Sequence, residues 1–225
     1  MRYEPHFYQT YVKEFILSHK EAAIFLDCGL GKTVVTLTAL EELLHDFFEI
    51  GKVLVIAPLR VARDTWPSEI AKWEHTKNIR ASVVMGSAKE RTAALLKPAE
   101  VYIINRENVK WLIEESNMPM DFDMIVIDEL SSFKSYQAKR FRALMKLRPS
   151  VKRIVGLTGT PSANGLMDLW AEFRLLDMGK RLGRFISHYR DAYFLPDKRN
   201  QQMVFSYKLR EGAEDAIYRR IEDTT

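Results

Sequence analysis

The strongest constraint on the fold is a repeated alternation of short apolar runs with amphipathic segments. The runs are expected to form strands at 22–27, 52–57, 81–85, 101–104, 124–127 and 153–157. Segments with helical spacing are expected to form helices at 8–18, 33–50, 60–75, 87–96, 106–115, 136–147 and 166–176. Continuous apolar runs such as KVLVIA suit strands that are buried on both faces of a sheet. We therefore predict an α/β fold of three layers, α/β/α, with a mostly parallel sheet.

The bulk composition fits one large α/β domain or two small ones within 225 residues. The single cysteine excludes a disulfide framework and a four-cysteine zinc site. No apolar run approaches the roughly 18 residues that a membrane-spanning helix needs. The first 15 residues are too polar for a secretory signal. A soluble, cytoplasmic protein is the expectation.

Charge is distributed unevenly along the chain. Residues 1–129 carry 15 Lys and Arg against 20 Asp and Glu, whereas residues 130–225 carry 19 against 10. This asymmetry favours a polyanionic partner for part of the second half. A basic face that is only solvated is the alternative.

The stretch LDCGLGKT, residues 26–33, follows the first apolar run and precedes a long helical pattern. A glycine-containing turn between a strand and a helix lets backbone N–H groups and the helix N-terminus face a phosphate. Lys32 would reach the outer phosphates, and the Thr33 hydroxyl would hold a magnesium ion. The pattern is incomplete because Leu26 stands where the full motif has glycine. The alternative is a helix that begins after a turn, with Lys32 solvated.

Two further motifs follow later strands. Asp128 and Glu129 end an apolar run, where Asp128 would hold magnesium and Glu129 would orient and deprotonate an attacking water. Acidic residues are also common at helix starts for dipole reasons alone. The stretch LTGTP, residues 157–161, places Thr158 and Thr160 where their hydroxyls could bond to the acidic pair. A plain turn before proline is the alternative.

In their order and spacing these motifs resemble the first RecA-like lobe of superfamily-two helicases. Within that group they are similar to the Swi/Snf-like ATP-dependent DNA translocases, from about Tyr8 to Gly179. The resemblance rests on LDCGLGKT, APLRVARDTWPSEIAKW, DELSSFKS and LTGTPSANGLMDLWAEFRLLD. It departs from the family at Ser131, where the family usually has histidine.

The resemblance implies a RecA-like P-loop domain that binds ATP and Mg²⁺ and acts on duplex DNA. The catalytic residues it implies are Lys32, Asp128 and Glu129. The residues expected to hold the nucleotide are Gln9, Gly29, Leu30, Gly31, Lys32 and Thr33, and those expected to hold the metal are Thr33 and Asp128. Thr158 and Thr160 would couple hydrolysis to strand movement. The expected nucleic-acid contacts are Arg60, Asn105, Arg106 and Lys134.

Several conspicuous residues have more than one interpretation. Trp66, Trp73 and Trp170 are expected to pack in the core rather than stack on bases. Cys28 lies inside the phosphate loop. It is either a small buried residue or a thiol close enough to the phosphates for its alkylation to block ATP binding.

A motor of this kind has two RecA-like lobes, and the second supplies arginines that stabilise the transferred phosphoryl group. The sequence ends 65 residues after Thr160, and a further lobe would need about 150 residues. We therefore expect residues 1–178 to form the first lobe and residues 179–225 to form a basic helical connector. Such a lobe alone would hydrolyse ATP weakly or not at all.

The expected function is the ATP-binding lobe of a DNA-dependent ATPase and translocase. Preference for duplex DNA over RNA follows from the resemblance only. The alternatives are an unrelated P-loop NTPase, such as a nucleotide kinase, and a non-catalytic nucleotide-binding module. The TGTP motif argues against the first, and intact Lys32 and Glu129 argue against the second.

Overall fold

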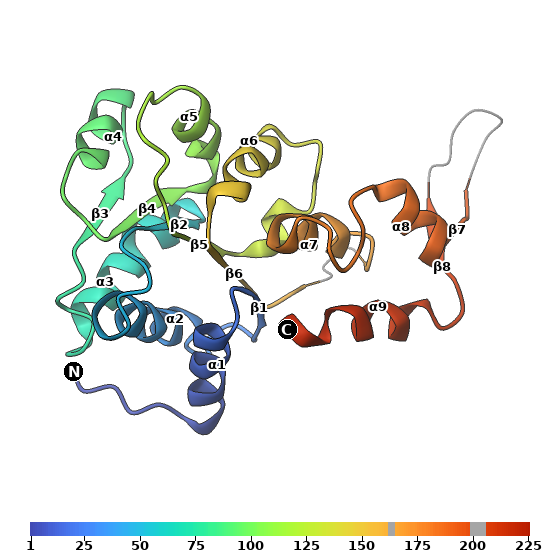
Figure 1. Ribbon diagram of the computed structural model, residues 1–225, viewed down its shortest axis with the longest axis horizontal. Helices are drawn as coiled ribbons and strands as arrows, with labels where there is room; N and C mark the ends of the chain where they lie inside the picture. The colour runs from blue at the N-terminus through green and yellow to red at the C-terminus, as the bar shows by residue number, and fades with distance from the viewer. Residues whose placement is uncertain (162–164, 199–205) are drawn as a thin grey trace.

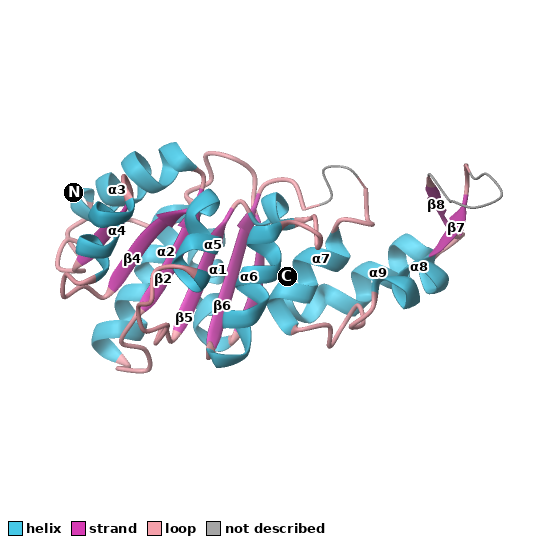
Figure 2. Cartoon of the chain, turned by 90° about the horizontal axis from the view of Figure 1, so that it is seen from above, coloured by secondary structure: helices cyan, strands magenta, loops and turns pink. Residues whose placement is uncertain are grey.

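The computed structural model describes residues 1–161, 165–198 and 206–225. Six strands form one sheet in which all neighbours run parallel, in the order β1-β6-β5-β2-β4-β3 (Figure 1). The strands are β1 Glu21–Phe25, β2 Val53–Ala57, β3 Ala81–Val84, β4 Val101–Asn105, β5 Met124–Asp128 and β6 Arg153–Thr158. Helices lie on both sides of this sheet (Figure 2). The predicted three-layer α/β fold with a parallel sheet is therefore confirmed.

The two faces of the sheet bury separate apolar clusters. On β2, Leu54 and Ile56 belong to one cluster, whereas Val53 and Val55 belong to the other. This is why the strand sequences are apolar without alternation. One face is covered by α1 Phe7–Ser18, α2 Lys32–Glu41 and α3 Trp66–Lys72. The other is covered by α4 Ala88–Leu95, α5 Val109–Glu114, α6 Lys139–Leu147 and α7 Leu169–Asp177.

The last part of the chain extends from one end of the molecule (Figure 1). It comprises α8 Ile186–Tyr193, β7 Phe194–Pro196, β8 Tyr207–Leu209 and α9 Ala213–Ile221. Buried Tyr189 and Ile217 belong to the same apolar cluster as Trp170 on α7. The apolar core therefore continues past residue 178, and the division at that residue stays a prediction.

Two minor predictions concern segments that lie partly outside the described residues. The alternating pattern at 203–209 predicts an extended segment, of which Tyr207–Leu209 forms β8 and pairs antiparallel with β7. A turn is expected at 197–202, most of which lies outside the described ranges. In the parts of the chain that the structure describes, no helix is both long enough and apolar enough to cross a membrane.

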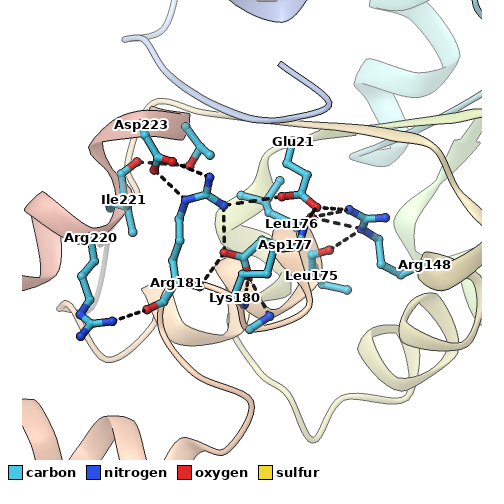
Figure 3. Close-up of polar contacts among 12 residues, drawn as sticks. Glu21, Arg148, Leu175, Leu176, Asp177, Lys180, Arg181, Arg220, Ile221 and Asp223 are labelled. Carbon is cyan, nitrogen blue, oxygen red and sulfur yellow. Dashed lines mark hydrogen bonds and ion pairs between the residues drawn. The ribbon is translucent and has the colours of Figure 1, made fainter. Parts of the chain in front are cut away.

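An ion-pair cluster around Arg181 attaches the end of the chain to the sheet (Figure 3). Arg181 donates Nε and Nη2 to the two carboxylate oxygens of Asp223 at 2.7 and 2.8 Å. Its Nη1 lies 3.2 Å from Asp177 Oδ2 and 3.6 Å from Glu21 Oε2. Glu21 begins β1, Asp177 ends α7, and Asp223 follows α9. One guanidinium group thus joins three elements.

The predicted helix at 33–50 is too long. It ends at Glu41 and is followed by a wider, π-helical turn, Glu42–Asp46. Phe48 then has a φ of 52°, which a helix does not allow. Phe47 and Phe48 are 59% and 80% exposed, so their helical spacing does not reflect burial.

The predicted helix at 60–75 is also interrupted. A π-helical turn at Val61–Thr65 leads into α3, which ends at Lys72. Pro67 lies within the first two positions of α3 and lacks a backbone N–H. Because the missing donor breaks the ordinary bonding to the preceding turn, proline accounts for the wider geometry there.

Candidate nucleotide-binding site

The three sequence motifs meet because their strands are neighbours. β1, β6 and β5 lie side by side and run parallel, so their carboxyl ends share one edge of the sheet. The phosphate loop follows β1, the acidic pair closes β5, and the TGTP motif closes β6. Ligands of open α/β sheets bind outside this edge.

The loop 26–31 has the backbone of an anion cradle. Gly29 and Gly31 have φ values of 85° and 79°, in the left-handed region that favours glycine. A Cβ on Gly31 would lie 2.5 Å from the Gln9 side-chain nitrogen, so a larger residue would displace the Gln9 amide. No side chain caps α2 at Gly31, which leaves its first N–H groups open to an anion.

Leu26 does not weaken this loop. Its N–H donates to the Thr158 carbonyl at 3.1 Å, which extends the pairing of β1 with β6. Its φ is not positive, so the position has no need of glycine. Lys32 Nζ donates to the carbonyls of Leu26 and Asp27 at 2.7 and 3.0 Å. The ammonium group is thereby held at the loop.

Gln9 connects the N-terminal segment to the loop. Its Oε1 accepts from the Tyr3 hydroxyl at 3.1 Å and from the His6 N–H at 3.0 Å. Its Nε2 donates to the Leu30 carbonyl at 3.2 Å. The side chain is 7% exposed, and the contact with a nucleotide that the resemblance implies for Gln9 would compete with these bonds. Gln9 lines the cleft together with Tyr3 and His6.

Asp128 lies in a nearly buried position at the end of β5. Trp66, on α3, donates its indole N–H to Asp128 Oδ2 at 2.9 Å. Burial raises the pKa of the Asp128 carboxyl, as does the neighbouring charge of Glu129. The Trp66 bond and the charge of Lys32 act in the opposite direction. These two groups therefore favour the ionised form, which is the form that can hold a cation.

Glu129 has an unusual backbone. Its φ of 67° and ψ of 65° place a residue with a side chain in the left-handed region, which typically costs about 1 kcal/mol or more. Its Oε1 accepts from the hydroxyls of Ser131 and Thr158, the latter at 3.1 Å. Ser131 stands where a histidine was expected, and it contacts the carboxylate directly.

The TGTP segment lies against the phosphate loop. A Cβ on Gly159 would lie 3.4 Å from the Leu26 carbonyl and 3.6 Å from the Cys28 sulfur. The Thr160 N–H donates to the Thr158 hydroxyl at 3.1 Å, while the Thr160 side chain is exposed. Of the two threonines, Thr158 is the one whose hydroxyl bonds to the acidic pair. Cys28 is exposed and lines the cleft, so the interpretation as a buried residue is wrong.

A cleft of about 800 Å³ opens over the phosphate loop and the acidic pair, whereas Thr158 and Thr160 do not line it. Clefts of about 300–1,000 Å³ are usual for small-molecule and cofactor sites. Its walls include residues from the N-terminal segment, the phosphate loop, α3 and the acidic pair, among them Gly29, Lys32, Thr33, Asp128 and Glu129. The glycine cradle, the lysine and the carboxylate pair fit a magnesium nucleotide in their chemistry. No group of three or more His, Cys, Asp or Glu side chains that could hold a metal ion occurs in the described part of the chain.

A further carboxyl group, that of Glu172, lies near the acidic pair. Glu172, on α7, is fully buried, and neither of its oxygens has a hydrogen-bond partner among the described residues. Burial, together with the charges of Asp168 and Glu129, raises the pKa of Glu172 to about 9. Lys134 lies 3.7 Å from Asp168 Oδ2 and opposes this shift. The Glu172 carboxyl is therefore protonated at neutral pH.

The predicted nucleic-acid residues are not equally accessible. Arg60 is exposed at the start of the π-helical turn, and Arg106 pairs with Glu107 at 2.9 Å. Asn105 is 5% exposed, and its side-chain amide bonds to Glu107 and Asn108. The amide of Asn105 thus shapes the loop rather than facing outward. Whether any of these residues contacts nucleic acid stays a prediction.

Sequence reasoning missed two polar contacts of the acidic pair. Trp66 is buried as expected, as is Trp170, whereas Trp73 is only partly buried. The bond from Trp66 to Asp128 spans 62 residues and follows from the packing of α3 beside β5. In the sequence, Ser131 is only a departure from the family pattern. The one signal for its contact is its position two residues after Glu129.

Comparison with known proteins places these motifs in context. The model of the SNF2-related domain family matches residues 8–224. Protein p41 of Acyrthosiphon pisum secondary endosymbiont phage 1 is 42% identical over 198 residues, which cover 85% of this chain and 43% of that protein. Transcription regulatory protein SNF2 of Saccharomyces cerevisiae is 32% identical over 158 residues, covering 68% of this chain and 9% of that protein. The chain spans less than half the length of these relatives.

Solved structures share the fold. The Sulfolobus solfataricus SWI2/SNF2 ATPase core in complex with dsDNA matches with a TM-score of 0.78 at 23% identity, over 100% of this chain and 44% of that one. The UvsW helicase from bacteriophage T4 matches with a TM-score of 0.60 at 16% identity, over 78% of this chain and 58% of that one. At these identities the likeness concerns the fold alone.

Proposed function

The chain belongs to the SNF2-related domain family, and on this premise we propose that it is the first ATP-binding lobe of a DNA-dependent ATPase and translocase. The proposal rests on one observation. Lys32, Asp128 and Glu129 line the same cleft, although they follow or end two different strands, β1 and β5, on either side of β6. A phosphate cradle with its lysine and an acidic residue that holds Mg²⁺ recur in P-loop enzymes that transfer phosphoryl groups. The fold of the dsDNA-bound Sulfolobus core is compatible with a DNA partner.

The loop would bind the phosphates of ATP. Gly29, Leu30 and Gly31 would offer backbone N–H groups, and Lys32 would exchange its bonds to the Leu26 and Asp27 carbonyls for phosphate oxygens. Thr33 and Asp128 would hold the magnesium ion. When bound, that ion would neutralise charge on the outer phosphates.

Glu129 would position and deprotonate the attacking water. The hydroxyls of Ser131 and Thr158 both donate to its Oε1, and its other oxygen, Oε2, would accept the proton. Thr158 and Thr160 lie at the end of β6 and just beyond it, so a shift of this segment would alter the contact of Thr158 with Glu129. We propose this link as the route by which hydrolysis is coupled to movement.

Efficient hydrolysis would need more positive charge at the transferred phosphoryl group than Lys32 supplies. In related phosphoryl-transfer systems an additional arginine changes the rate by about 10³ to 10⁵. We propose that a second RecA-like lobe completes the cleft with such arginines. Residues 1–178 would be the first lobe, and residues 179–225 would lead toward the second.

Nucleotide binding tests the core of the proposal. A fluorescent ATP analogue should bind the chain in the presence of Mg²⁺, and Lys32→Ala should weaken this binding at least about tenfold because it removes a charged phosphate contact. Glu129→Gln should leave the binding within about twofold, since Glu129 acts on water. Failure of the unaltered chain to bind at about 1 mM nucleotide would contradict the proposal.

DNA dependence is tested separately. A chain that also contains the second lobe should hydrolyse ATP faster with duplex DNA than without it, and the stimulation should fall between 50 and 200 mM salt. Equal stimulation by a matched RNA duplex would argue against the DNA preference. Absence of any stimulation at low salt would exclude the translocase function and leave a nucleotide-binding domain.

A further inference from the structure

The basic charge in the second half of the chain is concentrated in one acid-free stretch. Between Glu129 and Asp168 the sequence has no Asp or Glu. The same stretch contains eight basic residues: Lys134, Lys139, Arg140, Arg142, Lys146, Arg148, Lys152 and Arg153. The structure shows which of these charges are compensated.

Two of the arginines are structural. Arg148 is 3% exposed and donates to the carbonyls of Leu175, Leu176 and Val151 near the end of α7. Arg153 is also 3% exposed and donates to backbone carbonyls at the end of α1 and to Glu49. Both side chains satisfy helix C-termini within the fold, so neither is available to a partner.

Three of the lysines have acidic neighbours. Lys152 lies 2.7 Å from Asp123, and Lys146 lies 2.5 Å from Glu114. Lys134 lies 3.7 Å from Asp168. The positive charges of these three lysines are therefore compensated by carboxylates within the fold.

Arg140 turns inward from the first turn of α6. Its Nη2 donates to the Ser132 carbonyl at 2.8 Å, and its guanidinium lies 5.7 Å from the Phe133 ring centroid. Lys139 and Arg142 differ from it because both are exposed and neither has an acidic oxygen within 4.0 Å among the described residues. We call these two residues, three apart on one helix face, the α6 ridge.

The location of the α6 ridge is unfavourable for stability alone. The N-terminus of a helix carries a positive partial charge, so cations in the first turn are destabilising there by about 0.3–1 kcal/mol each. α6 has no acidic residue in its first turn to offset this effect. A phosphate would be attracted by the two side chains and by the helix end together.

The α6 ridge also lies at the edge of the sheet that carries the cleft. The chain leaves β5 at its carboxyl end and enters β6 at its amino end, so α6 begins near the carboxyl edge. α6 contacts the short 3-10 helix Arg106–Asn108, which follows the carboxyl end of β4. The ridge is therefore on the same side of the lobe as exposed Arg60 and as Arg106.

We propose that Lys139 and Arg142 bind the phosphate backbone of duplex DNA and extend the expected DNA-binding surface from Arg106 onto α6. This inference rests on the proposed function, which it deepens by adding two DNA-binding residues. Residues three apart on a helix are neighbours on one face, and the long side chains of Lys139 and Arg142 are both exposed, so each can reach a phosphate of the same DNA strand. Two neighbouring phosphates can thus be neutralised together. Such binding would add affinity without sequence preference.

The experiment measures duplex binding directly rather than hydrolysis. Anisotropy of a fluorescent 20-base-pair duplex is titrated with the chain at 50 and 200 mM salt. The test variant is Lys139→Gln with Arg142→Gln, and the matched control is Lys152→Gln. Lys152 belongs to the same acid-free stretch but precedes β6, at the opposite edge of the sheet.

The double variant should bind the duplex about tenfold more weakly at 50 mM salt, and its log–log salt slope should fall by about 1.8, or 0.9 for each phosphate that is no longer neutralised. Lys152→Gln should stay within twofold of the unaltered chain. A double variant that also stays within twofold, with an unchanged slope, would overturn the proposal. Binding that an acidic polypeptide displaces as well as duplex DNA does would also overturn it, because the partner would then not be a nucleic acid.

Two controls separate this proposal from the function it rests on. Thermal unfolding of each variant shows whether it is folded, and the fluorescent ATP analogue reports on the cleft independently. A chain that binds nucleotide but no duplex at 50 mM salt refutes the α6 ridge and leaves the nucleotide site standing. A chain that binds duplex through the α6 ridge but no nucleotide refutes the ATP-binding function instead.

Discussion

Single residues around Asp128 determine how readily it ionises. The carboxyl is nearly buried at the end of β5, where it lines the cleft, and burial by itself raises its pKa and favours its neutral form. The indole N–H of Trp66 compensates part of this loss with a bond of 2.9 Å. Trp66 is buried in the core, and its N–H thereby favours the ionised Asp128 carboxylate that the proposed cation binding requires.

Trp66→Phe should weaken Mg²⁺-dependent nucleotide binding by about 10- to 100-fold, the usual effect of removing a group that orients a metal ligand. The loss should be largest at low pH, because without the N–H bond the pKa of Asp128 rises further. The measurement is analogue affinity against pH at fixed Mg²⁺. Trp170→Phe is the matched control, since Trp170 is also buried but donates to the Gly183 carbonyl, outside the cleft. Equal effects of both substitutions would contradict the proposed role of the Trp66 N–H in supporting Asp128.

Glu172 should make stability depend on pH. Its pKa of about 9 in the folded chain is above its ordinary value of 4.5, so the folded state binds the proton more tightly. The stabilisation is complete below about pH 4.5 and is lost progressively as pH rises to about 9, by at most about 1.4 kcal/mol per pH unit. Glu172→Gln should remove this slope and raise the melting temperature at pH 8. Unfolding free energies measured from pH 5 to 9 check this.

A matched substitution makes the pH test specific. Glu14 has a side chain that is 62% exposed, so Glu14→Gln should leave the slope in place. If Glu172→Gln retains the slope of the unaltered chain, the buried carboxyl is not its source.

At the scale of elements, the strands were easier to predict than the helices. Apart from the edge strand β3, each strand of the parallel sheet is mainly an apolar run whose central residues are buried on both faces, so local composition is sufficient to locate it to within one or two residues. Helix ends depend on turn geometry that periodicity does not describe, as the π-helical turns after Glu41 and before Trp66 show. The capping box from Ser87 to Glu90 is the exception, because its signal is purely local.

Some parts of the candidate site could be predicted from the sequence, and others could not. Loops that follow apolar strands could be assigned from sequence, because parallel strands bring their carboxyl ends to one edge. The bond of Trp66 to Asp128 and the burial of Glu172 could not be assigned, since both arise from packing between segments far apart in the chain. The resemblance implied that Asn105 contacts nucleic acid, yet in the structure its amide is occupied by Glu107 and Asn108.

The attachment of α9 depends on Arg181, whose side chain is only 18% exposed and meets carboxylates from three elements. Arg181→Gln should increase hydrogen exchange of the α9 amides by about tenfold, because the last helix would open locally more often. Lys180→Gln is the control, since Lys180 is 62% exposed and pairs with Glu21 alone. Unchanged exchange in α9 would show that burial of Ile217 and Ile221 suffices to hold it.

At the scale of the whole molecule, one of the two apolar clusters runs from the sheet through α7 into α8 and α9. Residues such as Leu182 and Tyr189 therefore share their burial with residues before position 178. Side chains that pack in one shared core are exposed to water together, which favours a single cooperative transition. The segment proposed as a connector, residues 179–225, is thus joined to the preceding residues by a shared apolar cluster.

Urea unfolding should accordingly show one transition, with coincident curves from circular dichroism and tryptophan fluorescence. The tryptophans lie before position 178, whereas α8 and α9 contribute to the dichroism. Two separated transitions would instead support a boundary at residue 178 that unfolds independently.

Cys28 has a practical consequence for studying this lobe. It is the one cysteine of the sequence, it is exposed, and it lies in the wall of the cleft proposed to bind the nucleotide. A thiol-reactive dye would therefore label the native chain at a single place, with no cysteine to remove elsewhere. The rate of labelling and the emission of the attached dye would both report occupancy of the cleft. A dye attached to Cys28 would thus allow binding in the cleft to be followed by fluorescence without further changes to the chain.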